Sequence, residues 1–140
     1  MLVRIVKMRF QEDKIAAFLA NFEENKDKIK EELADVFAYA FLIAEDERGE
    51  ALGFQAIGPR KTLPPEACDI ATFTRSGKAQ LGIGSALFSA TEKKAKALGY
   101  HWINATILNQ NTGGQAYYQS RGFEPYKHTS ERVFMRFPLH

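Results

Sequence analysis

The sequence lacks the features that mark secreted, membrane-spanning, metal-binding and nucleic-acid-binding proteins. Its single cysteine, Cys68, excludes an internal disulfide and a multi-cysteine metal site. His101, His128 and His140 have no spacing that suggests a metal site. No apolar run approaches the ~20 residues of a membrane span, and the alternating start is unlike a signal peptide. The net charge is only +2 and no basic block is dense, so we expect no nucleic-acid partner. Together these absences predict a cytoplasmic protein that has no metal and no membrane partner.

The composition is that of an ordinary globular domain. The chain has 140 residues, of which 45% are hydrophobic and 26% are charged. Such a length can bury a core without disulfides or metals. We therefore expect a single domain over residues 1–140.

Hydrophobic periodicity predicts the order strand, helix, three strands, helix, strand, helix, two strands. The predicted strands are residues 2–10, 36–44, 51–57, 68–74, 101–108, 123–128 and 131–139, and the predicted helices are about 13–35, 82–98 and 112–120. The charged segment 45–50 with Gly49 predicts a hairpin turn. The buried stripe expected for the middle helix is Ile83, Ala86, Leu87, Ala90, Ala97 and Leu98. This pattern is typical of an α+β or mixed α/β domain with one sheet covered by helices.

The segment from Asp69 to Phe88 is the first candidate ligand site. It predicts a strand, a loop ending in Gly82-Ile83-Gly84, and a helix. Bare N–H groups and the helix dipole at such a junction suit a phosphate, although small residues also begin helices for packing reasons alone. The loop lacks the lysine and serine or threonine of a nucleotide-triphosphate loop, and no acidic residue follows at the distance of a dinucleotide fold. A pyrophosphate that needs no metal fits better.

Two further polar features follow the strand at 101–108. The asparagines at 109–111 could hydrogen-bond an amide-rich ligand, or they could simply form a turn. Tyr117 and Tyr118 are adjacent on a short predicted helix and are not expected to face the same way. One is predicted to pack while the other points into the cleft between the two helix starts, the alternative being two surface tyrosines.

Together these residues resemble a known family. Gly82-Ile83-Gly84-Ser85-Ala86-Leu87-Phe88 looks like the central motif of the GNAT superfamily of N-acetyltransferases. Ile103-Asn104-Ala105-Thr106-Ile107, Asn111 and Tyr118-x-x-x-Gly122-Phe123 resemble the motif that follows it in that family. The resemblance covers about residues 41–126 and implies a single GNAT-like domain. Its fold would be a central mixed, mostly antiparallel sheet of about seven strands covered by about three helices.

The resemblance also implies an acetyl-coenzyme A (acetyl-CoA) site. The pyrophosphate would lie on the N–H groups of about Gln80 to Ser85, and the pantetheine would run along the strand ending at Thr74 like an added strand. The implied cofactor-binding residues are Thr72, Phe73, Thr74, Ala79, Gln80, Leu81, Gly82, Ile83, Gly84, Ser85, Asn111, Gly114 and Tyr117.

The chain departs from the family's pattern at two places. Ala79 stands where the family has Gln or Arg, and Lys78 or Gln80 could substitute for it. The first ~30 residues instead resemble the opening of antibiotic-biosynthesis-monooxygenase-like ferredoxin folds. The chain is therefore either a divergent member of the family or a composite sequence, natural or engineered.

The expected activity is acetyl transfer from the thioester to a primary amine of a small molecule or amino-acid-like acceptor by direct attack. Tyr118 is placed by resemblance to protonate the leaving thiolate, because a phenol with a pKa of about 10 keeps its proton at neutral pH. Either water or Asp69, the only acid in the motif strand, would take the amine's proton. The alternative is a non-catalytic CoA-binding or structural domain. A homodimer is possible through the closing strand.

Overall fold

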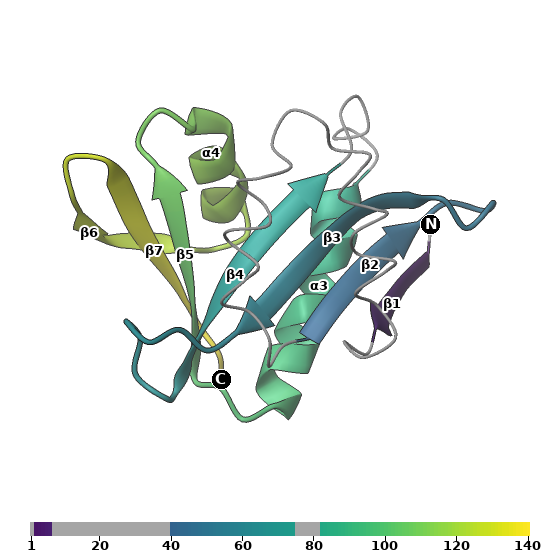
Figure 1. Ribbon diagram of the computed structural model, residues 1–140, viewed down its shortest axis with the longest axis horizontal. Coiled ribbons are helices and arrows are strands. Elements are labelled where there is room, and N and C mark those ends of the chain that lie inside the picture. Colours follow the sequence, from purple (N-terminus) through teal and green to yellow (C-terminus); the bar gives the residue numbers. More distant parts are fainter. Residues whose placement is uncertain (1, 7–39, 75–81) are drawn as a thin grey trace.

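Seven strands form one sheet in the computed structural model, which describes residues 2–6, 40–74 and 82–140 (Figure 1). The strands are β1 (Leu2–Val6), β2 (Ala40–Glu45), β3 (Ala51–Gly58), β4 (Ala67–Thr74), β5 (Trp102–Leu108), β6 (Glu124–His128) and β7 (Arg132–Pro138). They lie in the order β1-β2-β3-β4-β5-β7-β6, and only the β4–β5 pair is parallel. The predicted mixed, mostly antiparallel sheet is confirmed.

Two helices are described, α3 (Ile83–Ala97) and α4 (Thr112–Ser120). Helix α3 packs on the β1–β4 part of the sheet, and α4 lies beside the end of β5 (Figure 1). The bounds predicted for α4 agree with the structure, and those for α3 differ by one residue at each end. The helix predicted at 13–35 lies outside the described residues, as do residues 7–10 and 36–39 of the two strands predicted there.

The predicted hairpin turn between β2 and β3 is confirmed. The Asp46 carboxylate accepts hydrogen bonds from the backbone N–H groups of Arg48 and Glu50, both at 2.9 Å. Gly49 has a φ of 78°, a left-handed conformation that favours glycine. The charged segment therefore ends one strand and starts the next through local side-chain-to-backbone bonds.

The buried stripe of α3 differs from the predicted one at its C-terminal end. The buried residues are Ile83, Leu87, Phe88, Thr91 and Ala95, whereas Ala97 and Leu98 are exposed. Ala86 and Ala90 are only partly buried. Residues 83, 87, 91 and 95 form an i, i+4 row on one face of the helix. Because Thr91 is polar, a pattern of apolar residues alone does not predict this row.

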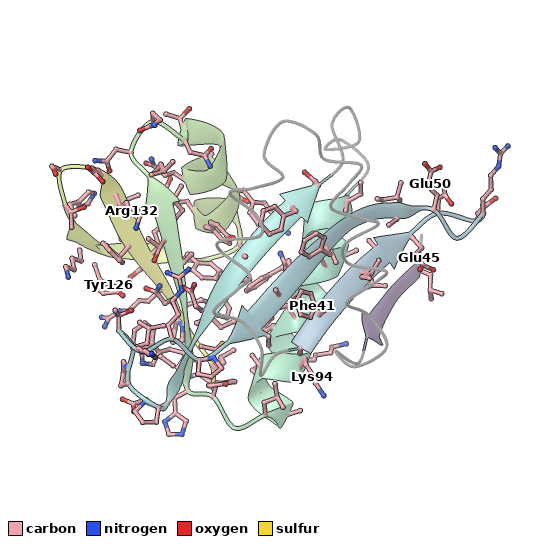
Figure 2. All side chains as sticks on the ribbon, viewed as in Figure 1. Phe41, Glu45, Glu50, Lys94, Tyr126 and Arg132 are labelled. Carbon is pink, nitrogen blue, oxygen red and sulfur yellow. The ribbon has the colours of Figure 1, made fainter. Side chains whose placement is uncertain are left out.

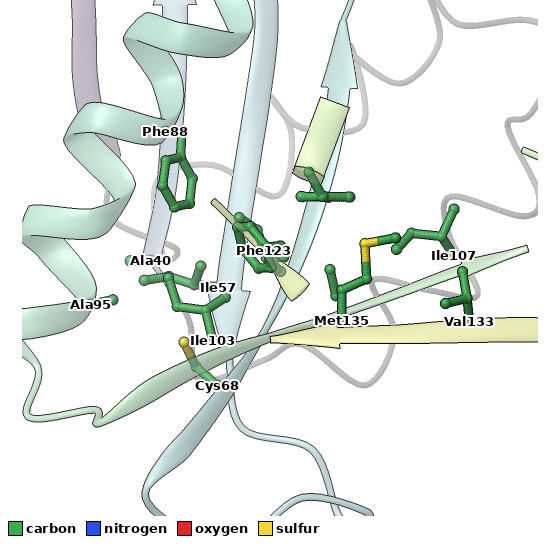
Figure 3. Close-up of a cluster of buried hydrophobic side chains, with 13 residues drawn as sticks. Ala40, Ile57, Cys68, Phe88, Ala95, Ile103, Ile107, Phe123, Val133 and Met135 are labelled. Atoms are coloured by element: carbon green, nitrogen blue, oxygen red, sulfur yellow. The ribbon is translucent and has the colours of Figure 1, made fainter. Parts of the chain in front are cut away.

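Phe88 and the residues around it form the main core on the face of the sheet covered by the helices. Phe88 meets Phe123 and Phe137 edge-to-face at ring-centroid distances of 5.4 and 5.1 Å. Cys68 of β4, Ile103 of β5 and Met135 of β7 contribute to the same cluster (Figure 3). These contacts fix α3 against the strands on which the candidate site is built.

Cys68 should make the protein less stable at alkaline pH. Burial, with a smaller contribution from the charge of Asp69, raises the pKa of the thiol from 9.0 to about 12. Because the folded-state pKa is the higher one, this stabilisation is complete below about pH 9 and is lost as pH rises toward about 12. Between about pH 8 and about pH 10.5, the free energy of unfolding should fall by about 2 kcal/mol more in the wild type than in Cys68→Ala. Urea unfolding at both pH values measures this difference, and equal losses in the two proteins would contradict it.

Candidate functional site

Strands β4 and β5 separate part of the way along the sheet. Their registered pairs run only from Ala67–Trp102 to Asp69–Asn104. Beyond this last pair, which we call the vertex, β4 stays paired with β3 as far as Thr74, while β5 stays paired with β7 (Figure 1). The β5-facing edge of residues 70–74 thus has no strand partner among the described residues. An open edge of this kind can pair with an extended, amide-containing ligand.

A partly buried polar network lies beside this edge, on the face of the sheet covered by the helices. Thr91 of α3 donates to Gln55 Oε1 at 2.6 Å, and Gln55 Nε2 donates to Tyr117 Oη at 2.7 Å and to Thr72 Oγ1 at 3.2 Å. Thr72 Oγ1 and Tyr118 Oη are 2.8 Å apart. We call these five residues the Gln55 network. It joins β3, β4, α3 and α4, and it holds the Tyr118 hydroxyl next to the open edge of β4.

The two tyrosines of α4 reach the same network, so the prediction that they point in different directions is wrong. Adjacent helical residues are rotated by about 100°, but long phenol rings can still bring their hydroxyl ends together. The ring centroids of Tyr117 and Tyr118 are 5.1 Å apart. Burial raises the pKa of Tyr117 to about 12, against the smaller opposing effects of the Gln55 hydrogen bond and the Arg121 charge. Tyr117 therefore keeps its proton, which it donates to the Gly84 carbonyl at 2.7 Å.

Gly84 is required by this tyrosine. A Cβ atom at Gly84 would lie 2.5 Å from Cε1 of Tyr117. Gly82 has a different role, because its φ of 72° is left-handed and no described residue would contact a Cβ atom there. Gly84 thus leaves room for a ring and Gly82 adopts a left-handed backbone conformation, while the contact of both glycines with a cofactor stays a prediction.

Gly84→Ala should lower the free energy of unfolding by about 1–3 kcal/mol, because the new methyl group overpacks against Tyr117. Gly113→Ala is the matched control: it lies in α4, and its nearest neighbour would be Asn111 Oδ1 at 3.9 Å. There the loss of glycine from a helix should be neutral or should stabilise by about 0.5–1 kcal/mol. Urea denaturation compares the two variants, and a Gly84→Ala protein as stable as Gly113→Ala would contradict the assignment.

The start of α3 suits an anion. Among the described residues, no side chain caps its N-terminus, and its first turn contains no acidic residue. Arg121, at the end of α4, donates a hydrogen bond from Nη1 to Ser85 Oγ. A guanidinium thus lies beside the positive end of the helix dipole, where both favour negative charge.

Asn111 and Gly114 occupy the other end of α4. Asn111 Oδ1 accepts a hydrogen bond from Gly114 N at 2.9 Å and so caps the helix. A Cβ atom at Gly114 would lie 2.7 Å from Asn111 Nδ2. The structure gives this pair a capping function, and its predicted contact with a cofactor stays a prediction.

Asp69 lies on the opposite face of the sheet from Thr72, because alternate residues of a strand point to opposite sides. Its carboxylate is 2.9 Å from Arg60 Nε and accepts a hydrogen bond of 2.8 Å from Asn104 Nδ2. Asn104 also donates to Thr106 Oγ1 at 3.0 Å and accepts from the hydroxyl of Tyr126, a residue of β6 (Figure 2). This cluster joins β4 to β5 at the vertex. The structure does not bring Asp69 and Tyr118 together.

The remaining predicted residues divide by position. Phe73 packs its ring on Phe54 at a centroid distance of 4.7 Å, on the face opposite Thr72, and Thr74 ends the β3–β4 ladder. Ile83 is fully buried, which leaves only its backbone for a ligand. Ala79, Gln80 and Leu81 lie outside the described residues. Within the described ranges, no group of His, Cys, Asp or Glu could hold a metal ion, and no helix is long and apolar enough to cross a membrane.

Sequence reasoning missed three residues of the site, Gln55, Thr91 and Arg121. A signal existed for the first two. Gln55 interrupts an apolar strand, and Thr91 lies on the buried row of α3, so each had to find a polar partner in the core. Arg121 gave no such signal, because it is partly exposed and its contact depends on how α4 meets α3.

The sequence matches a known family over most of its length. A profile described as the Acetyltransferase (GNAT) family matches residues 7–123. This match begins well before residue 41, where the predicted resemblance began, and it includes most of the segment compared with ferredoxin-like folds. A composite origin is therefore unnecessary. A comparison with curated protein sequences gives no significant match.

Solved structures share the fold over nearly the whole chain. A ribosomal-protein-alanine N-acetyltransferase from Brucella melitensis is 20% identical with a TM-score of 0.76, covering 99% of this chain and 100% of its own. The putative acetyltransferase yncA from Salmonella typhimurium, solved with acetyl-CoA, is 17% identical with a TM-score of 0.75, over 99% and 94%. A GNAT superfamily phosphinothricin acetyltransferase from Sinorhizobium meliloti, also in complex with acetyl-CoA, is 20% identical with a TM-score of 0.72, over 99% and 88%.

Proposed function

We propose that this chain, which belongs to the Acetyltransferase (GNAT) family, transfers an acetyl group from acetyl-CoA to a primary amine of a small molecule or amino-acid-like acceptor. The observation that carries this proposal is the separation of β4 and β5 beside the Tyr118 hydroxyl. An open strand edge and a tyrosine hydroxyl lie at the same position of the sheet, which supports the proposal.

The described residues fit the two polar parts of acetyl-CoA. The amide groups of the pantetheine can pair with the free edge of residues 70–74, as an added strand does. The pyrophosphate suits the uncapped start of α3, where the backbone of Gly82–Ser85 and the guanidinium of Arg121 favour an anion. Arg121 could thus supply the charge that the family places at the position of Ala79.

In the proposed reaction, acetyl-CoA supplies an activated thioester and the residues of this chain orient it and move one proton. A backbone N–H of the β4 edge can stabilise the developing oxyanion. Tyr118 Oη gives its proton to the departing sulfur. Water takes the proton of the attacking amine, because the structure does not bring Asp69 together with Tyr118. Asp69, the other base predicted from the sequence, is the alternative to water in this proposal.

Thiol release tests the proposal. The protein is incubated with acetyl-CoA and a panel of primary amines, and free thiol and acetylated amine are measured together. We expect thiol release that depends on both amine and protein. Binding of CoA without amine-dependent release would favour the non-catalytic alternative. The absence of a thermal shift at millimolar CoA would contradict both, since a 100-fold excess over Kd adds about 2.7 kcal/mol of stability.

Arg121→Ala should raise the KM for acetyl-CoA by about 10-fold and leave kcat within about twofold, because a charge-assisted hydrogen bond to a phosphate contributes about 1.5 kcal/mol. The difference from the wild type should shrink as salt is added. Arg132→Ala is the matched control, since this exposed arginine lies at the start of β7 (Figure 2). Initial-rate kinetics at two salt concentrations measure both variants. If Arg121→Ala and Arg132→Ala have the same KM, Arg121 does not serve the pyrophosphate.

A further inference from the structure

The hydroxyl of Thr72 lies between the side chain of Gln55 and the hydroxyl of Tyr118. It accepts a hydrogen bond from Gln55 Nε2 at 3.2 Å and lies 2.8 Å from Tyr118 Oη. Gln55 is fully buried, and Tyr118 is only 7% exposed. Thr72 is only partly buried, but the amide hydrogens of the fully buried Gln55 must go to the protein's own groups.

The hydrogen bonds of Gln55 fix which way its amide points. Gln55 Oε1 accepts from Thr91, while the two hydrogens of Nε2 go to Tyr117 and Thr72. In this orientation Tyr117 can give its own hydrogen to the Gly84 carbonyl. If the amide were reversed, Gln55 Oε1 would face the Tyr117 hydroxyl. Tyr117 would then have to donate its hydrogen to Gln55, and the Gly84 carbonyl would lose Tyr117 as a donor. The network as a whole therefore makes Gln55 a donor toward Thr72.

A threonine hydroxyl that accepts from Gln55 still has one hydrogen to give, and Tyr118 Oη is within reach of it. In the neutral tyrosine either hydroxyl can be the donor. After Tyr118 loses its proton, the donor in this pair of hydroxyls can only be Thr72, and the hydrogen bond becomes charge-assisted. Burial makes a phenolate unfavourable, so a fixed donor at this atom matters most at that stage.

We propose that Thr72, oriented by Gln55, is a positioning residue that stabilises the Tyr118 phenolate formed during acetyl transfer. This inference rests on the proposed function. In the step concerned, the carbon–sulfur bond breaks with its electron pair on sulfur, and the Tyr118 proton moves to that sulfur to give the thiol. Water accepts the proton released by the attacking amine and returns one proton to the phenolate, so the charges balance.

The test compares Thr72→Val, which keeps the side-chain shape, with Thr72→Ser, which keeps the hydroxyl. We expect Thr72→Val to lower kcat by about 10-fold with little change in the KM for acetyl-CoA, because one charge-assisted hydrogen bond is lost. The alkaline limb of the pH–kcat profile should move upward by about one pH unit. Thr72→Ser should restore both quantities. Thr106→Val, on the opposite face of the sheet, is the control and should change neither.

A second readout does not need turnover. NMR of tyrosine labelled with ¹³C at Cζ, with Tyr118 assigned from the spectrum of Tyr118→Phe, follows phenol ionisation directly. We expect Tyr118 to ionise at higher pH in Thr72→Val than in the wild type or Thr72→Ser. If the wild type shows no acetyl transfer but Tyr118 still ionises at higher pH in Thr72→Val, the proposed function is contradicted and the Thr72–Tyr118 coupling stands. Equal ionisation in all three proteins, or a Thr72→Val protein with unchanged kcat, would overturn the inference.

Discussion

Tyr118→Phe is expected to lower kcat for acetyl transfer by at least about 100-fold, the usual contribution of a positioned general acid. The ring remains and continues to pack against Phe123, whose centroid is 5.0 Å away. Only the hydroxyl is lost, and with it the bond to Thr72, so stability should fall by only about 1 kcal/mol. The KM for acetyl-CoA should change little, because the lost interaction acts on the departing sulfur and not on the bound thioester.

Tyr100→Phe is the matched control for this variant. Tyr100 packs at the edge of the same core, but it follows the end of α3 at the opposite end from Gly84. Its kcat should equal that of the wild type. Initial-rate kinetics with saturating amine decide the matter: a Tyr118→Phe enzyme that keeps wild-type kcat would show that Tyr118 does not donate the proton.

Asn104→Leu should lower the free energy of unfolding by about 3 kcal/mol, because three partly buried hydrogen bonds are lost, one of them to a carboxylate. Asn104 is 2% exposed and bonds to Asp69, Thr106 and Tyr126. Leucine is similar in size to asparagine, so the expected loss of stability comes from the polar groups of Asp69, Thr106 and Tyr126, which lose a hydrogen-bond partner. Because Asp69–Asn104 is the last registered pair of β4 and β5, the change also weakens the vertex from which the two strands separate.

Thr106→Val removes only one neutral hydrogen bond of the same cluster and should cost about 1 kcal/mol. Chemical denaturation of both variants at neutral pH provides the comparison. If Asn104→Leu were no less stable than Thr106→Val, the cluster would not be what holds β4 and β5 together.

The sequence predicted most of the fold because its signals are local. The turn at 45–50 rests on the side chain of Asp46 and on Gly49, and α4 begins at the Asn111 cap. Strand order and the strand edge left open by β5 are not local. They follow from how α3 and α4 cross the sheet. The family resemblance implied a ligand along the strand that ends at Thr74, but the order of the strands in the sheet was not predicted.

The site was predicted less completely than the fold, for the same reason. Tyr118 and Thr72 were found from the motif, but the hydrogen bonds that join the network connect residues 17 to 62 positions apart. In the sequence, Gln55 and Thr91 interrupt apolar patterns that are far apart. In the structure, the Thr91 hydroxyl donates a hydrogen bond to Gln55 Oε1 at 2.6 Å. A polar residue within a buried row indicates that a partner exists, but it does not say which residue is the partner.

A crystal structure of the protein with CoA tests the central claim most directly. We expect the pantetheine to lie along the β5-facing edge of residues 70–74, with its sulfur within hydrogen-bonding distance of Tyr118 Oη. The pyrophosphate should lie at the start of α3 near Arg121. CoA bound elsewhere, or bound with its sulfur away from Tyr118, would contradict this account.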